Sequence, residues 1–242
     1  MDRSQLKAIK CYFIAQMINH YYWVHTDGDD PTGKISIENV ERIVTRLSGL
    51  QIKKFSVPFE GKAVQGNVER NADRTVRIHI REDQTEGEMR FTAIKELFHL
   101  IADDNGDFST NVVKAIGDLV KYQQRALDGQ ASDELRAERA AEVFALEIIY
   151  PFEHRDSDQA DHKAGTPLDE IAKKRGVPLY WVRRALTQSH LDRSRKLWGS
   201  LPVNVEFPPL PKEGEIDGPV ISVEEVHIED ETEDTGENNG GK

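Results

Sequence analysis

The sequence predicts an α+β protein in which helices flank a few strands in the middle of the chain. Two observations support this prediction. Apolar residues recur every three or four positions over 6–24, 37–47, 90–101 and 132–150, which is the spacing of amphipathic helices. Between the second and third of these segments, residues 55–59 form a short apolar run and residues 75–80 alternate apolar and polar side chains, as strands do.

The segments between these elements predict where each of them ends. Gly49 is a stop signal for the helix over 37–47, and Gly61, Gly66 and residues 71–73 are typical of turns between strands. A polar stretch at 103–110 separates the helix over 90–101 from a further helical pattern at 112–126. Pro151 ends the helix over 132–150, and the charged run 153–163 is interpreted as a linker.

The rest of the chain predicts two short helices over 166–197, joined at residues 176–178, and then an extended or disordered end. We therefore divide the chain into four parts. They are an N-terminal helix (1–32), a main α+β domain (33–155), a helical segment with a helix-turn-helix outline (166–198) and a flexible tail that is first proline-rich and then acidic (199–242).

Composition indicates a soluble globular chain. Hydrophobic residues make up 38% of its 242 residues and charged residues 31%, and no stretch approaches the roughly 18 apolar residues of a membrane span. The first residues lack the layout of a signal peptide, and Cys11, the single cysteine, cannot form an internal disulfide. We expect a cytoplasmic protein with no membrane partner.

The net charge of −11 is concentrated in the tail, where residues 212–242 hold eleven acidic residues against two lysines. Three interpretations of this tail stay open. It could be solvating disorder, it could fold back on the basic segment 173–196 and mask it, or it could imitate nucleic acid towards a DNA-binding partner. The stretch 220–228 also alternates in part, so that it could add a strand to a sheet edge.

The most informative motif is Lys95-Glu96-Leu97-Phe98-His99, which has the outline of H-E-x-x-H with lysine at the first histidine position. Residues four apart share a helix face, so two imidazoles there can bind one zinc while the glutamate polarises a bound water. A catalytic zinc also needs a third protein ligand. By itself the pattern is more typical of an ordinary amphipathic helix than of a metal site.

Two further blocks make the motif specific. Arg90-Phe91-Thr92-Ala93 precedes it, and Glu138 opens a block that continues with Ala141, Phe144, Ala145 and Pro151. In this order the motifs over about 33–198 resemble those of the ImmA/IrrE family of metallopeptidases. The resemblance implies a zincin-like fold with Glu96 as general base, His99 and Glu138 as two zinc ligands, and Lys95 at the remaining ligand position.

Lysine is a poor substitute for a zinc-binding histidine. It must lose its proton to bind metal, and its ordinary pKa near 10.4 opposes that at neutral pH. We therefore expect a broken metal site and no bound zinc, unless another residue such as His20, His79 or His154 completes the site. As an alternative to metal, the Lys95 ammonium could pair with Glu96 or Glu138 and replace one buried cation by another.

Members of the resembled family cut helix-turn-helix repressors, often in mobile elements or stress responses. The resemblance therefore implies a regulatory, catalytically impaired homologue that binds such a repressor without cleaving it. An active zinc endopeptidase with an unidentified third ligand is the first alternative. The second is a DNA-binding protein that uses residues 166–198.

The DNA-binding alternative depends on basic residues of the segment 166–198. Their simpler interpretation is a solvated face on helices that pack through Ile171, Val177, Trp181, Val182 and Leu186. The candidate phosphate contacts are Lys173, Lys174, Arg175, Arg183 and Arg184.

Overall fold

The computed structural model describes residues 3–26, 34–60, 64–102, 133–199, 207 and 209–212. Within these ranges eight helices and one three-stranded sheet form an α+β fold, which confirms the predicted fold class. In chain order the elements are α1 (Arg3–His25), α2 (Ile37–Ser48), β1 (Gln51–Val57), β2 (Gly66–Arg70), β3 (Thr75–Arg81), α3 (Glu86–Ala102), α5 (Asp133–Ile149), α6 (Phe152–Lys163), α7 (Leu168–Arg175), α8 (Leu179–Ala185) and α9 (Gln188–Gly199).

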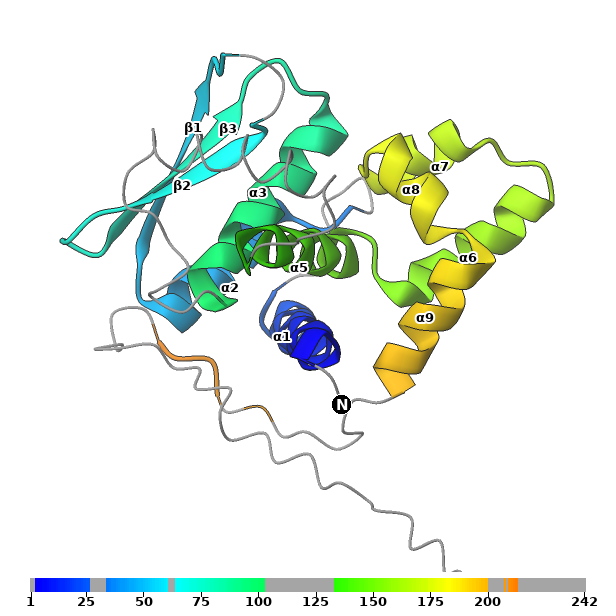
Figure 1. Ribbon diagram of the computed structural model, residues 1–242, viewed down its shortest axis with the longest axis horizontal. Helices are drawn as coiled ribbons and strands as arrows, with labels where there is room; N and C mark the ends of the chain where they lie inside the picture. The colour runs from blue at the N-terminus through cyan, green and yellow to red at the C-terminus, as the bar shows by residue number, and fades with distance from the viewer. Residues whose placement is uncertain are drawn as a thin grey trace, which may run out of the picture.

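Helices α3 and α5 lie at the centre of the molecule, with the sheet on one side and the lobe of α6–α9 on the other (Figure 1). Helix α3 packs against α5, α2, β2 and β3, and α1 packs against α5. The rings of Phe98 on α3 and Phe144 on α5 lie 4.7 Å apart in the core. Four of the five helices predicted before Pro151 correspond to α1, α2, α3 and α5, although α3 begins earlier, at Glu86.

The sheet has the order β1-β3-β2, with β1 parallel and β2 antiparallel to the central strand β3. The strand predicted over 75–80 is confirmed as β3. The strand predicted over 55–59 begins earlier, at Gln51, because Gly49 adopts a left-handed conformation (φ 63°) that ends α2 and turns the chain directly into β1. Gly66 was expected in a turn, but it is the first residue of β2.

The interpretation of the charged run 153–163 as a linker is wrong, because these residues belong to helix α6. Two of its charged side chains, Arg155 and Asp158, are completely buried. Arg155 Nη1 lies 2.8 Å from Glu147 Oε1 on α5, and Asp158 accepts two hydrogen bonds from Arg175 on α7. Burial is tolerated because each charge has a partner, and those partners lie outside the run.

The segment 166–197 contains three helices, α7, α8 and α9, rather than two. Gly176, with φ 63°, caps α7 and leads into Pro178 and α8, as the predicted junction at 176–178 requires. The expected packing through Ile171, Val177 and Trp181 is confirmed, since all three are buried. None of the described helices is long and apolar enough to span a membrane.

Part of the proline-rich segment lies against the body of the protein. Leu210 is buried, and Arg46 on α2 donates hydrogen bonds to the carbonyl oxygens of Leu210 and Pro211. The ring of Phe207 lies 5.7 Å from that of Phe13 on α1. The helix expected over 112–126 and the acidic residues 213–242 lie outside the described residues.

Candidate functional site

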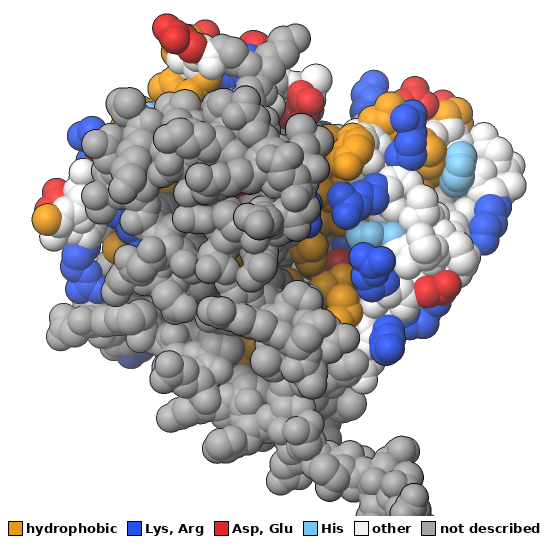
Figure 2. Space-filling model, viewed as in Figure 1, with side chains coloured by type: hydrophobic (Ala, Val, Ile, Leu, Met, Phe, Trp, Pro, Cys, Tyr) orange, Lys and Arg blue, Asp and Glu red, His pale blue; other side chains and the backbone are white. Residues whose placement is uncertain are grey.

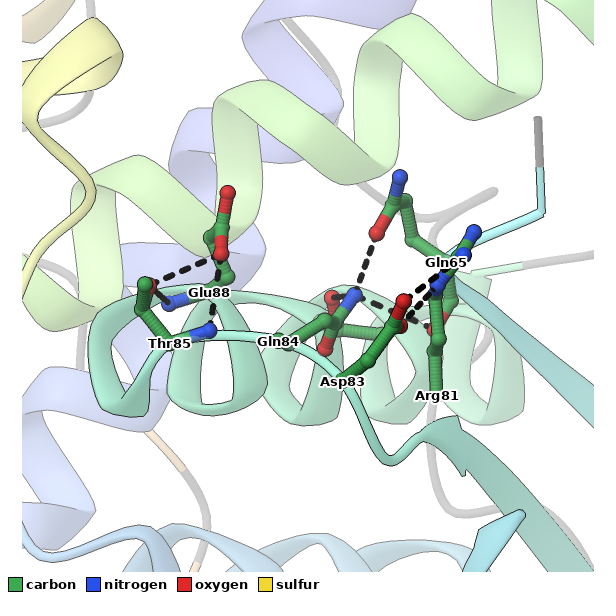
Figure 3. Close-up of polar contacts among 7 residues, drawn as sticks. Gln65, Arg81, Asp83, Gln84, Thr85 and Glu88 are labelled. Carbon is green, nitrogen blue, oxygen red and sulfur yellow. Dashed lines mark hydrogen bonds and ion pairs between the residues drawn. The ribbon is translucent and has the colours of Figure 1, made fainter. Parts of the chain in front are cut away.

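Helix α3, which carries the Lys95–His99 motif, begins with a capping box at Thr85 and Glu88 (Figure 3). The Thr85 N–H donates to Glu88 Oε2 at 2.8 Å, and the Glu88 N–H donates to Thr85 Oγ1 at 3.4 Å. This reciprocal pair satisfies backbone donors that a helix N-terminus otherwise leaves open. The start of the site helix is therefore encoded locally.

The sheet is held close to the same helix. Gln84 Nε2 donates to Gln65 Oε1 at 2.5 Å and to Thr92 Oγ1 at 3.1 Å, so that it joins the chain entering β2 to α3 (Figure 3). At Gly66 a Cβ atom would lie 2.5 Å from Thr92 Cγ2 and 2.8 Å from Glu96 Oε1. A side chain larger than that of glycine would clash where β2 passes Thr92 and Glu96, which explains why this strand residue is a glycine.

The four residues that the motifs single out lie together in one cluster. Lys95 Nζ lies 2.7 Å from Glu138 Oε2 and 2.9 Å from Glu96 Oε1. His99 Nε2 lies 3.2 Å from Glu138 Oε1. Lys95 and His99 are one turn apart on α3, and Glu138 reaches them from α5. The ammonium is thus paired with both carboxylates, whereas the sequence left open which of them it would meet.

The low solvent exposure of these side chains strengthens the electrostatic interactions between them. The exposed fractions are 13% for the Lys95 side chain, 4% for Glu96, 6% for His99 and 28% for Glu138. Burial by itself lowers the pKa of Lys95, but the carboxylates of Glu138 and Glu96 outweigh it and hold this pKa above its usual range. Burial likewise opposes ionisation of Glu138, yet Lys95 and His99 hold the pKa of this carboxyl well below its usual range.

Other contacts position the cluster. Arg90 Nη2 donates to the Ile35 carbonyl oxygen at 2.6 Å, and Arg90 Nε donates to that of Gly176 at 3.3 Å. The ring of Phe91 stacks on Trp181 of α8 with the centroids 4.8 Å apart. The Arg90–Ala93 block therefore joins α3 to the lobe of α7 and α8.

Sequence reasoning missed Glu142, which lies one turn beyond Glu138 on α5. Burial raises the pKa of its carboxyl and Glu138 adds to this, while the charges of Lys95 and Arg184 oppose it. The four-residue spacing of Glu138 and Glu142 was the available signal. Arg70 was also missed; its Nη2 donates to the His99 carbonyl oxygen at 2.6 Å, a contact that no local pattern indicates.

The arrangement does not fit a bound zinc ion. The carboxylates of Glu96 and Glu138 stabilise the protonated form of Lys95, and an ammonium has no lone pair to offer a metal. Over the described ranges, no group of three or more histidine, cysteine, aspartate or glutamate side chains could hold a metal ion. Of the substitute histidines, His20 lies beside the ring of Phe207, and His79 Nε2 lies 3.6 Å from Glu69 on the sheet. His154 lies on α6.

The candidate phosphate contacts separate into two groups. Arg175 forms two hydrogen bonds, of 2.8 and 2.9 Å, with the buried Asp158 and so has a structural role. Lys174 lies 3.6 Å from the same carboxylate. The side chains of Lys173, Arg183 and Arg184 are exposed, with the Arg184 guanidinium 5.2 Å above the ring of Trp181.

Together the fold and the cluster are those of a zincin-like α+β domain in which Lys95, Glu96, His99 and Glu138 lie close to one another. A family model described as the IrrE N-terminal-like domain (Peptidase_M78) matches residues 49–187, from the start of β1 to just beyond α8. This span is more than half of the chain, and the chain belongs to this family, as the motif resemblance implied. No curated protein matches the chain.

Proposed function

We propose that this protein is a catalytically impaired ImmA/IrrE-type homologue that acts by binding a protein partner. The proposal is supported above all by one observation: the Lys95 ammonium lies between the carboxylates of Glu96 and Glu138. The partner that family membership favours is a helix-turn-helix transcriptional repressor. The protein would then regulate transcription in the cytoplasm by binding this repressor without cleaving it.

The ammonium supplies the positive charge that these buried carboxylates need. Removing a charged partner from a buried pair leaves an uncompensated charge, which is strongly destabilising. A lysine attached to α3 provides that partner permanently, with no dependence on metal supply. The domain can therefore keep the shape of a peptidase while its charges are balanced within the chain.

The same pairing argues against hydrolysis. Glu96 Oε1 lies 2.9 Å from Lys95 Nζ, so the carboxylate at the general-base position forms an ion pair with a cation of the protein itself. A protonated lysine cannot polarise a water as a Lewis acid does. On this proposal the site has no Lewis acid with which to activate a nucleophile, and the protein acts through binding.

Metal content is the first test. We expect wild-type protein, purified untagged without added metal, to hold far less than one zinc per chain by mass spectrometry. Lys95→His should gain close to one zinc per chain, because it would place two imidazoles and Glu138 on the required positions. Lys95→Met is the matched control: it also removes the ammonium but supplies no ligand, and should gain none. Stoichiometric zinc in wild type would contradict the proposal and favour an active endopeptidase.

Partner binding is the second test. A candidate helix-turn-helix repressor should bind wild type and Glu96→Gln with equal affinity, with or without a chelator, and should remain intact on prolonged incubation. Cleavage of the repressor by wild type that is lost in Glu96→Gln would sink the proposal.

A further inference from the structure

Helix α8 carries an exposed surface that combines apolar and basic side chains. Tyr180 is 64% exposed and Leu179 is 38% exposed, among the few large apolar side chains of the described residues that face solvent. Arg183 and Arg184 lie three and four residues beyond Tyr180, on the same helix face. Figure 2 shows lysine and arginine side chains spread over this lobe, with hydrophobic side chains along its inner border.

A shallow cavity of about 200 Å³ adjoins this helix. Val177, Pro178 and Leu179 give its lining an apolar part, and Lys34 and Lys173 give it positive charge. Lys34 is paired with Glu86 at 2.6 Å. Within the described ranges, no carboxylate forms an ion pair with Lys173 or Arg183. We refer to Lys173, Leu179, Tyr180 and Arg183 as the α8 surface.

The acidic tail of the chain has the complementary chemistry. Its segment 220–231 places Val223, Val226 and Ile228 among five carboxylates, so it offers apolar and acidic side chains side by side. The chain reaches Lys212 against α2, where Arg46 holds the two preceding carbonyl groups. From there, the seven residues 213–219 lead to the segment, and the eight steps from residue 212 to residue 220 can span roughly 27 Å, comparable with the radius of a domain of this size.

We propose that residues 220–231 bind the α8 surface of the same molecule, with acidic side chains on Lys173 and Arg183 and apolar ones on Leu179 and Tyr180. The tail would then cover a face that adjoins the Phe91–Trp181 stack and hence the site helix. An external acidic partner would have to displace it. The tail therefore acts as a built-in competitor, and this contact does not depend on whether the site cleaves or binds a substrate.

Carbodiimide crosslinking of the intact chain tests the contact, because it joins an amine to a carboxylate only where the two already touch. An equal mixture of ¹⁴N- and ¹⁵N-labelled chains distinguishes links within one molecule from links between two. We expect Lys173 to be linked to glutamates or aspartates of 220–231, without isotope mixing. The yield should fall several-fold in 1 M salt, where the Debye length is about 3 Å.

Variants make the test specific. Tyr180→Ala/Arg183→Glu should reduce the Lys173 links several-fold, whereas Phe55→Ala/Arg42→Glu makes the same changes at exposed residues of β1 and α2 and should leave them unchanged. The links Lys34–Glu86 and Lys54–Glu41, whose charged atoms lie 2.6 and 2.5 Å apart, report that each variant is folded. Isotope-mixed links would mean that the tail binds a second copy. Either that result or absence of tail links beside intact internal ones would overturn the proposal.

Discussion

At position 95, lysine and histidine would interact with the neighbouring side chains in different ways. A neutral imidazole donates a lone pair to a metal, whereas an ammonium donates protons to oxygen acceptors. In this protein Lys95 Nζ donates a hydrogen bond to Glu138 Oε2 at 2.7 Å and forms an ion pair with Glu96 Oε1 at 2.9 Å. With lysine at this position, the charges of the cluster are balanced within the chain.

Lys95→Met should lower the free energy of unfolding by about 2–4 kcal/mol, because it leaves the carboxylates of Glu96 and Glu138 without their cation in a mostly buried site. Urea denaturation at pH 7 measures this change. Adding Glu138→Gln to Lys95→Met should restore part of the loss, since it removes one of the stranded charges.

The matched control for this prediction is Lys54→Met, which removes the lysine of a more exposed pair with Glu41. It should cost at most about 1 kcal/mol, the usual range for pairs near the surface. Equal losses in the two lysine variants would show that the Lys95 cluster contributes no more than an ordinary surface pair.

At the scale of elements, the charged helices α6 and α9 contain ionised groups that pair with other elements, such as Arg155 with Glu147 on α5 and Arg195 on α9 with Asp156 on α6. His190, near the start of α9, is an exception, since its Nε2 has no hydrogen-bond partner within the described residues. Burial lowers the pKa of His190 to about 4, and the positive charges of Arg155, Arg184 and Arg193 contribute to this.

Because the folded state favours neutral His190, the protein should lose stability on acidification. The unfolded chain takes up this proton near pH 6.5, so the contribution is fully present above that pH and is lost as pH falls from 6.5 towards 4. Allowing for solvent screening at a partly exposed group, we expect about 1–2 kcal/mol. Urea midpoints at pH 7 and pH 4.5 should therefore differ less in His190→Gln than in wild type.

Other groups also titrate between pH 7 and pH 4.5. The prediction therefore concerns the difference between wild type and His190→Gln in how much the urea midpoint changes over this range. His162→Gln on α6 replaces an exposed histidine and controls for the loss of one titratable group. If the pH dependence of His190→Gln and His162→Gln were the same, His190 would not be responsible.

At the scale of the whole molecule, one buried network joins the first helix to the last. Arg155 on α6 pairs with Glu147 on α5 and lies 3.4 Å from Ser194 Oγ on α9. Ser194 Oγ lies 3.1 Å from the Tyr12 hydroxyl on α1, and Trp198 Nε1 on α9 donates to Glu147 Oε2. The α6–α9 lobe is therefore held to the peptidase-like body by polar contacts as well as by apolar packing.

Arg155→Met should lower the free energy of unfolding by about 3–5 kcal/mol, because it strands the completely buried carboxylate of Glu147. Arg155→Met/Glu147→Gln should recover part of this loss. Arg195→Met, which removes an exposed arginine paired with Asp156 and Asp192, is the control and should cost at most about 1 kcal/mol. Urea denaturation followed by circular dichroism and by tryptophan fluorescence measures all three, and a small loss in Arg155→Met would contradict a structural role for the network.

Much of the fold and of the site followed from local sequence. Apolar spacing places the helices that became α1, α2, α3 and α5, because a helix buries one face and so repeats with its own period. The motifs identified Lys95, Glu96, His99 and Glu138 together, since residues four apart on α3 share a face and the order of the blocks matches the family. The capping box of Thr85 and Glu88 is also a local pattern, and it marks a start of α3 earlier than the predicted residue 90.

Only the tertiary structure decided which charges meet. A run of charged residues such as 153–163 resembles a linker until Glu147 and Arg175, from α5 and α7, pair with its buried Arg155 and Asp158. The pairing of Lys95 with both carboxylates, and the structural role of Arg175, depend in the same way on distant segments. The energy of a charge depends on its burial and on partners brought close by folding, and neither is a property of local sequence.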